Sequence, residues 1–140
     1  MLPALVLFAG MMFQDATPLP PGVTIWPKGA PVKGESKPIP SGAYALTIKR
    51  RDKNGAVEVH DKKTDIMIVQ SGEAILQVGG EPVNPTSIGP GETHATSIKS
   101  GAKRNVGVGD VIVVKAGTPH QFFIAPGSQI TYVLIKVTEQ

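Results

Sequence analysis

The chain has 140 residues, including 16 glycines, 13 prolines and no cysteine, and its formal net charge is +3. This length suits one domain with a single core, and the lack of cysteine excludes disulfide scaffolds, thiolate metal sites and a cysteine nucleophile. Glycine and proline together make up about a fifth of the residues, against roughly an eighth in average proteins, which argues against a helical bundle and favours short strands joined by turns.

The positive charges do not form the pattern of a nucleic-acid binder. The largest basic run is Lys49, Arg50 and Arg51, with Lys53 close behind, and the other basic residues are scattered among acidic ones. Nucleic-acid binders usually gather their basic residues on one face and add aromatic stacking residues. Aromatic residues make up only 5% of this chain, so we expect no nucleic-acid partner.

Residues 1–13 carry no charge and are almost wholly apolar. The run is too short for a membrane-spanning helix, which needs about 20 apolar residues, but it fits the apolar region of a secretory signal, about 7 to 15 residues long. We therefore predict a signal peptide over residues 1–16, no stable membrane span, and a periplasmic or secreted protein. The alternative is an N-terminal strand or an apolar arm on a partner subunit, which would leave the protein cytoplasmic.

Residues 17–42 contain seven of the thirteen prolines. Because proline lacks an N–H donor and has a fixed φ, this segment cannot form a central strand or a helix. We predict an extended lead-in that runs over the domain surface, with Ile25 and Trp26 as anchor points.

Residues 43–140 alternate between strand-forming and turn-forming runs. The run at residues 43–50 precedes Asn54 and Gly55, a strong hairpin signal. Residues 71–73 predict a turn between two paired strands, and residues 79–91 predict a long loop. No helical pattern and no fixed repeat occurs. The predicted strands cover residues 43–50, 57–60, 65–70, 74–78, 94–98, 110–114, 121–124 and 130–137. Such a series predicts an all-β fold, a single antiparallel β-barrel or jelly roll over residues 43–140.

Four residues able to hold a metal ion lie on or beside these strands. In the sequence VEVH, the two-residue period of a strand places Glu58 and His60 on one face. Asp65 begins the next strand after a short polar turn, and His120 stands at the start of a strand in the second half of the chain. Two imidazoles and two carboxylates suit a divalent ion such as Fe(II), Mn(II), Zn(II) or Ni(II). Taken singly, each residue has a plainer explanation, as a surface carboxylate, a hydrogen-bonded histidine or a turn cap.

The spacing of these residues resembles the first sequence motif of the cupin superfamily, G-x5-H-x-H-x3,4-E-x6-G. Glu58, His60, Asp65 and Gly72 follow that spacing. Glu58 stands where the motif has its first histidine, and Asp65 stands where it has glutamate. The shorter aspartate reaches about one C–C bond less far than glutamate.

The stretch GDVIVVKAGTPHQF resembles the second cupin motif, G-x5-P-x-G-x2-H-x3-N. Gly109, Gly117 and His120 match it, while Lys115 replaces its proline and Ile124 its asparagine. The resemblance implies a small single-domain cupin barrel. It also implies a divalent metal ion held by Glu58, His60, Asp65 and His120, although half of the usual ligand types have changed.

Two functions from different classes are consistent with this resemblance. One is a metal-dependent enzyme, such as an oxygenase or isomerase, that acts on a small molecule in the barrel, with Met67, Phe122 and Tyr132 as candidate pocket wall. The other is a non-catalytic protein that binds a small ligand and has a degenerate metal site. His94 matches no motif position; it would be an extra ligand or proton-transfer group only if its strand aims it inward. Small cupins commonly pair through edge strands, so we expect a homodimer.

Overall fold

The computed structural model describes residue 21, residues 39–40 and residues 42–140. The predicted signal peptide and nearly all of the proline-rich lead-in therefore lie outside the described residues. The described part of the chain forms β-strands and contains no helix, which confirms the all-β prediction. In that part no helix is present that could span a membrane.

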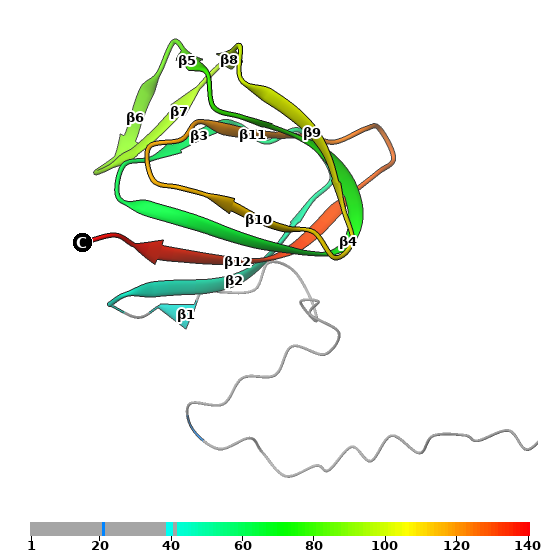
Figure 1. The fold of residues 1–140 in the computed structure, drawn as a ribbon, viewed down its shortest axis with the longest axis horizontal. Helices are drawn as coiled ribbons and strands as arrows, with labels where there is room; N and C mark the ends of the chain where they lie inside the picture. The colour runs from blue at the N-terminus through cyan, green and yellow to red at the C-terminus, as the bar shows by residue number, and fades with distance from the viewer. Residues whose placement is uncertain (1–20, 22–38, 41) are drawn as a thin grey trace, which may run out of the picture.

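Twelve strands occur among the described residues (Figure 1). Their bounds are β1 Ile39–Pro40, β2 Tyr44–Arg51, β3 Val57–His60, β4 Lys63–Val78, β5 Glu81–Val83, β6 Thr86–Gly89, β7 Glu92–Ala95, β8 Ser97–Lys99, β9 Ala102–Gly107, β10 Val111–Val114, β11 His120–Phe123 and β12 Ile130–Thr138.

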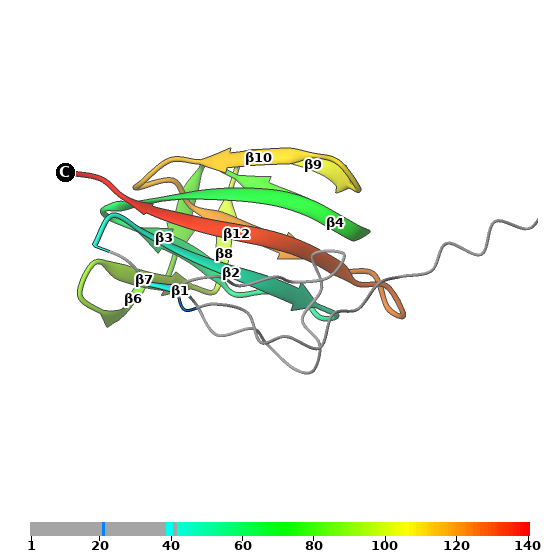
Figure 2. The ribbon, with the colours of Figure 1, turned by 90° about the horizontal axis from the view of Figure 1, so that it is seen from below.

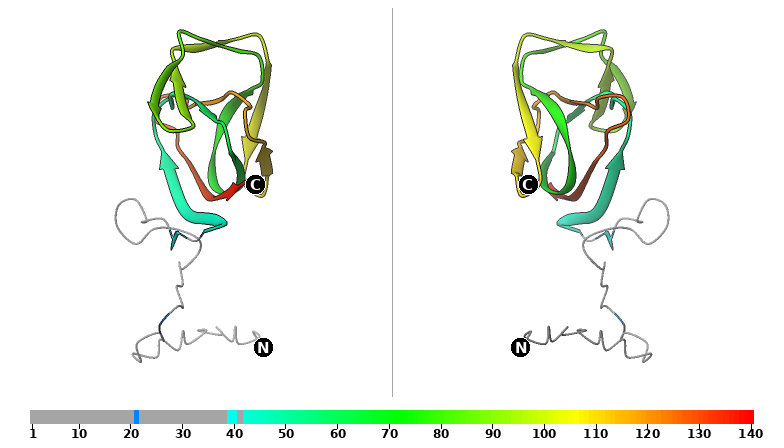
Figure 3. Two further views of the ribbon diagram at one scale, coloured as in Figure 1. Left: turned by 90° about the vertical axis from the view of Figure 1, so that its left-hand side faces the viewer. Right: turned by 90° about the vertical axis from the view of Figure 1, so that its right-hand side faces the viewer.

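The long strand β4 joins two antiparallel layers. Its first half pairs with β12 and β10, and β12 pairs in turn with β2, so these four strands lie side by side in one layer (Figure 2). Its second half pairs with β9 and β11, and β11 continues through β3 to β7 and β6 in the other layer. In the end-on views the strands wrap around a common interior (Figure 3).

The predicted turn at residues 71–73 is wrong, because β4 continues through it. Gly72 has a φ of +74°, and the register between β4 and β12 shifts at Thr131 and Tyr132, so one extra residue is taken up in a bulge. A Cβ on Gly72 would lie 1.8 Å from the carbonyl oxygen of Gln129, so only glycine fits there. The glycine bends the strand from one layer to the other instead of reversing it.

The predicted hairpin at Asn54 and Gly55 is also wrong, since β2 pairs with β1 and β12, and β3 pairs with β11 and β7. The turn crosses between the layers and is held by β11 and the residue that follows it: Gly55 N donates to the Phe122 carbonyl, and Ile124 N donates to Asn54 Oδ1. These long-range hydrogen bonds replace the local β2–β3 hairpin pairing that the Asn54–Gly55 sequence favours.

Two further expectations need correction, and one strand, β9, was not predicted. The predicted loop at residues 79–91 contains two short strands, β5 and β6. The predicted strand at residues 94–98 is two strands, β7 and β8, which pair with different partners. Strand β9 is polar and exposed over most of its length, so no apolar alternation marked it in the sequence.

The interior is apolar at one end and polar at the other. Inward-facing residues of β4 and β12 alternate with period two, and Tyr132 and Leu134 lie opposite Val69 and Met67. The same inward face continues to Asp65, which lies opposite Lys136. The apolar cluster consists of Met67, Val69, Ala74, Leu76, Val106, Val114, Phe122, Ile124, Ile130, Tyr132 and Leu134. The polar end holds the candidate site.

Candidate metal centre

Three strands bring the four predicted ligand residues to the polar end of the interior. Glu58 and His60 lie on β3, Asp65 lies near the start of β4, and His120 is the first residue of β11. Glu58 and His120 are directly opposite each other across the β3–β11 pair. Opposite residues of an antiparallel pair project from the same face of the sheet. Two motifs that are distant in the sequence therefore meet.

The ligand atoms of these residues lie close together. Glu58, His60 and His120 each offer one ligand atom, and these atoms all lie within 4.8 Å of one another. Asp65 Oδ2 lies 3.4 Å from His60 Nε2 and 3.5 Å from His120 Nε2. The side chains of Asp65 and His120 are 2% exposed and that of Glu58 is 29% exposed, so the cluster is buried but open at Glu58.

Both histidines are held by hydrogen bonds at Nδ1. The Thr118 carbonyl lies 3.1 Å from His120 Nδ1 and accepts a hydrogen bond from it, and a Glu92 carboxylate oxygen accepts a hydrogen bond from His60 Nδ1. An imidazole that donates from Nδ1 can present the Nε2 lone pair to a metal, and such partners commonly orient metal-bound histidines. The Nε2 atoms of both rings face the carboxylate of Asp65.

One atom of the cluster lacks a hydrogen-bond partner. His120 Nε2 is buried and accepts or donates no hydrogen bond, although it lies 3.5 Å from Asp65 Oδ2 and 3.6 Å from Glu58 Oε2. A buried polar atom without a partner is uncommon and calls for an explanation. A ring nitrogen that faces two carboxylates is explained by a cation in this position, either a proton on the nitrogen or a metal ion between the nitrogen and the carboxylates.

Each carboxylate around the two histidines has a cationic partner. Lys136 Nζ lies 2.8 Å from Asp65 Oδ1, and Arg51 lies 3.5 Å from Glu58 Oε2. Lys136 Nζ also lies 2.8 Å from His60 Nε2 and donates to it. Lys63 Nζ lies 2.9 Å from Oε1 of Glu92, the carboxylate that accepts from His60. Arg51 Nε also donates to the Tyr132 hydroxyl at 2.9 Å.

These partners shift the pKa values of the cluster. Burial alone would raise the pKa of Glu58, but His120 and Arg51 outweigh it and lower that pKa to about 2. In the same way the pKa of Asp65 is held far below its usual range by His120, His60 and Lys136, against the effect of burial. Burial would lower the pKa of His120, yet the facing carboxylates raise it to about 9. The two carboxylates therefore stay ionised and favour a cation at His120 Nε2.

Sequence reasoning missed Lys136 and Glu92. Lys136 follows Tyr132 and Leu134 on the inward face of β12. The sequence did carry a signal for it, because a lysine at this position interrupts a run of alternate apolar residues. Glu92 lies opposite His60 across the β3–β7 pair, and no local pattern announces that pairing. His94 lies opposite Glu58 on the same face of β3 and β7, but it is not part of the cluster within 4.8 Å.

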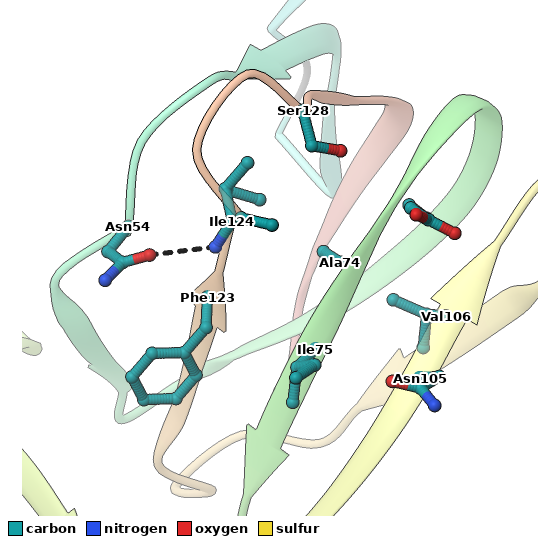
Figure 4. Close-up of a pocket in the computed structure, with 10 residues that line it drawn as sticks. Asn54, Ala74, Ile75, Asn105, Val106, Phe123, Ile124 and Ser128 are labelled. Carbon is teal, nitrogen blue, oxygen red and sulfur yellow. Dashed lines mark hydrogen bonds between the residues drawn. The ribbon is translucent and has the colours of Figure 1, made fainter.

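The predicted pocket-wall residues lie in the apolar core. Met67, Phe122 and Tyr132 are between 2% and 3% exposed, and the Phe122 and Tyr132 rings pack in a tilted arrangement with centroids 5.3 Å apart. Their role as a substrate wall stays a prediction. A separate cavity of about 590 Å³ opens between β4, β9 and β11, and Figure 4 shows it beside the Asn54–Ile124 hydrogen bond. None of the four predicted metal ligands lines that cavity.

Comparisons with known proteins place the fold. No protein-family model and no curated protein matches the sequence. The structure of TT1209 from Thermus thermophilus aligns over 84% of this chain and 98% of its own, with 15% identity and a TM-score of 0.55. Hydroquinone 1,2-dioxygenase PnpCD, in complex with Cd²⁺ and 4-hydroxybenzonitrile, aligns over 71% of this chain and 60% of its own, with 16% identity and a TM-score of 0.50.

A cupin protein from Bacteroides fragilis also matches, with 18% identity over 70% of this chain and 68% of its own and a TM-score of 0.47. Other matched structures are longer, and this chain spans 39% of one and 57% of another. The chain shares the antiparallel all-β fold of TT1209 and PnpCD, in agreement with the single jelly roll of cupin type that the two sequence motifs predict. At these identities the likeness is one of fold, and a shared fold does not by itself define an activity.

Proposed function

We propose that this protein binds a divalent metal ion through Glu58, His60 and His120, with Asp65 beside them, and acts as a metal-dependent oxygenase or isomerase on a small molecule. The observation that carries the proposal is His120 Nε2, which is buried, lacks a hydrogen-bond partner and faces two carboxylates. The histidine is already held at Nδ1 by Thr118, so its orientation is independent of the ion. The cluster lies at the polar end of a cupin fold.

The donor set fits the ions that the sequence suggested. Two imidazole nitrogens and carboxylate oxygens suit Fe(II), Mn(II), Zn(II) or Ni(II), and do not by themselves select one of them. When bound, such an ion would act as a Lewis acid that polarises a substrate oxygen. Around it, Glu92 would keep His60 in its orientation and Arg51 would hold Glu58. The exposed edge of Glu58 is the side from which a small molecule would approach.

A second candidate function is a non-catalytic cupin that binds a small ligand and has a degenerate metal site. The observation that favours it is Lys136, whose ammonium group already neutralises Asp65 and occupies His60 Nε2. A cluster whose carboxylates are all paired with cations attracts a further cation less strongly. The two functions differ in whether a metal ion is bound at one equivalent.

Elemental analysis of protein purified without added metal or a histidine tag, with Fe(II) kept reduced, tests the proposal. We expect about one equivalent of iron, manganese, nickel or zinc, and its loss in His120→Ala and His60→Ala. His94→Ala is the matched control, because it removes a histidine from the same sheet face that is not one of the three residues whose ligand atoms lie within 4.8 Å of one another. No metal in the wild type and no uptake on addition would reject the metal centre and favour the non-catalytic candidate. Equal metal in wild type and His120→Ala would place the metal elsewhere.

We further propose that the protein forms a homodimer and is exported. Val108, Val111 and Val113 are between 58% and 69% exposed on and beside the edge strand β10, and such apolar side chains support contact with a second copy. Light scattering at the mass of a monomer would reject the dimer. The apolar run at residues 1–13 supports export, and an intact N-terminus on protein from the native host would reject it.

A further inference from the structure

Lys136 belongs to the polar cluster but corresponds to no cupin motif position. It lies on β12 directly opposite Asp65, so the two side chains project from the same face into the interior. Its Nζ atom donates to Asp65 Oδ1 and to His60 Nε2, each at 2.8 Å. The side chain is 27% exposed, whereas that of Asp65 is 2% exposed, so Lys136 enters the cluster from the solvent side.

The ammonium group of Lys136 and a metal ion compete for the same atom. His60 Nδ1 is taken by Glu92, so Nε2 carries the only lone pair that His60 can offer. A neutral imidazole nitrogen has one such lone pair and can serve either an N–H donor or a metal ion. While Lys136 donates to it, His60 cannot act as a ligand.

The charges of the cluster lead to the same conclusion. Three ion pairs surround the two histidines, Glu58 with Arg51, Asp65 with Lys136 and Glu92 with Lys63. A divalent ion would add two positive charges to a group whose three carboxylates are each already matched by a cationic side chain. Of these three cations, only Lys136 contacts a histidine ligand atom, so its departure both frees a ligand and leaves a carboxylate for the ion.

We propose that Lys136 is a tethered cation that occupies the metal site in the metal-free protein and must leave His60 before a metal ion binds. The inference rests on the proposed metal centre and extends it by naming the residue that sets metal affinity. In this role Lys136 holds His60 and Asp65 in place when no ion is bound and lowers the affinity for metal. It is a positioning residue, not a ligand.

Calorimetric titration of the metal-free wild type, Lys136→Met and Lys63→Met with Zn²⁺, and separately with Co²⁺, tests this role. Methionine matches the unbranched apolar stem of lysine, one atom shorter, but has no charge and no N–H donor. Lys63→Met is the matched control because it removes the same charge from a neighbouring ion pair without freeing His60 Nε2. We expect Lys136→Met to bind about tenfold or more tightly than the wild type, and Lys63→Met to stay within about threefold of it.

The outcomes separate this inference from the proposed function. Equal affinity of the wild type and Lys136→Met would overturn the role of Lys136 and leave the metal centre intact. No binding by any of the three folded proteins would reject the metal centre itself. A gain in Lys63→Met as large as that in Lys136→Met would show a general charge effect and overturn the competition.

A measurement on the wild type keeps the inference testable if Lys136→Met does not fold. Acylation of Lys136 by an amine reagent, followed by peptide mass spectrometry, reports how free its Nζ atom is. We expect the reaction to speed up several-fold when the protein is saturated with Zn²⁺, while acylation of Lys115, an exposed lysine, stays constant. An unchanged rate at Lys136 in zinc-loaded protein would overturn the inference.

Discussion

Replacement of Lys136 by methionine should strongly destabilise the metal-free protein. The substitution removes the hydrogen bonds to Asp65 and His60 and leaves the Asp65 carboxylate, 2% exposed, without its closest cation. Loss of one partner of a buried ion pair costs about 3–5 kcal/mol. Because the Lys136 side chain is 27% exposed, part of its interaction is screened by water, and we expect a loss of about 2–4 kcal/mol in the free energy of unfolding.

The assay is urea unfolding at neutral pH with a chelator present, so that no metal ion replaces the lysine. Lys63→Met supplies the control, since the Lys63–Glu92 pair is more exposed, 42% and 23%, and its loss should cost about 0–1 kcal/mol. The double variant Asp65→Asn/Lys136→Met removes both charges and should recover at least half of the loss. The reasoning would be refuted if Lys136→Met unfolded within about 1 kcal/mol of the wild type, because Asp65 would then not need its ammonium partner.

Three other properties follow from the structure. The free energy of unfolding of the metal-free protein should fall as pH rises from 6.5 through about 9, because the pKa of His120 is raised to about 9 in the folded protein and its bound proton stabilises the fold below that range. Urea unfolding at a series of pH values measures this loss. The variant His120→Asn should not lose stability over the same range. Gly72→Ala should lower the free energy of unfolding by about 2–4 kcal/mol, because the added Cβ would lie 1.8 Å from a backbone oxygen and the φ of +74° disfavours a side chain. Gly89→Ala has open space around the added Cβ and should lower it by about 1 kcal/mol or less in the same assay. Glu92→Gln should weaken metal binding about tenfold or more in calorimetric titration, because the carboxylate orients His60.

Each of these expectations has an outcome that contradicts it. A pH profile of His120→Asn that matches the wild type would assign the alkaline loss to another group. Equal stability of the two alanine variants would mean that the strand relaxes around Gly72 without cost. Unchanged metal affinity in Glu92→Gln would remove the carboxylate from the support of His60.

Local sequence pattern determined the class of fold and the two halves of the site. The alternation in VEVH places Glu58 and His60 on one face of a strand, since a strand alternates its side chains whatever it pairs with. The glycine- and proline-rich composition and the short apolar runs predicted an all-β chain. The two motif spacings named His120 and Asp65 as partners of this strand, and the structure brings these residues together.

Tertiary structure alone decided how the strands pair and which charges join the site. Gly72 suits a turn as well as an extended strand, and only the pairing of β4 with β12 before it and with β9 after it keeps the strand running through this position. Lys136 and Asp65 are separated by 71 residues in the sequence, so their contact depends on strand register and not on any local signal. Glu92 reaches His60 for the same reason, across the β3–β7 pair. The two-residue period of a strand determines on which face a side chain lies, whereas the residues that it contacts there depend on long-range strand pairing.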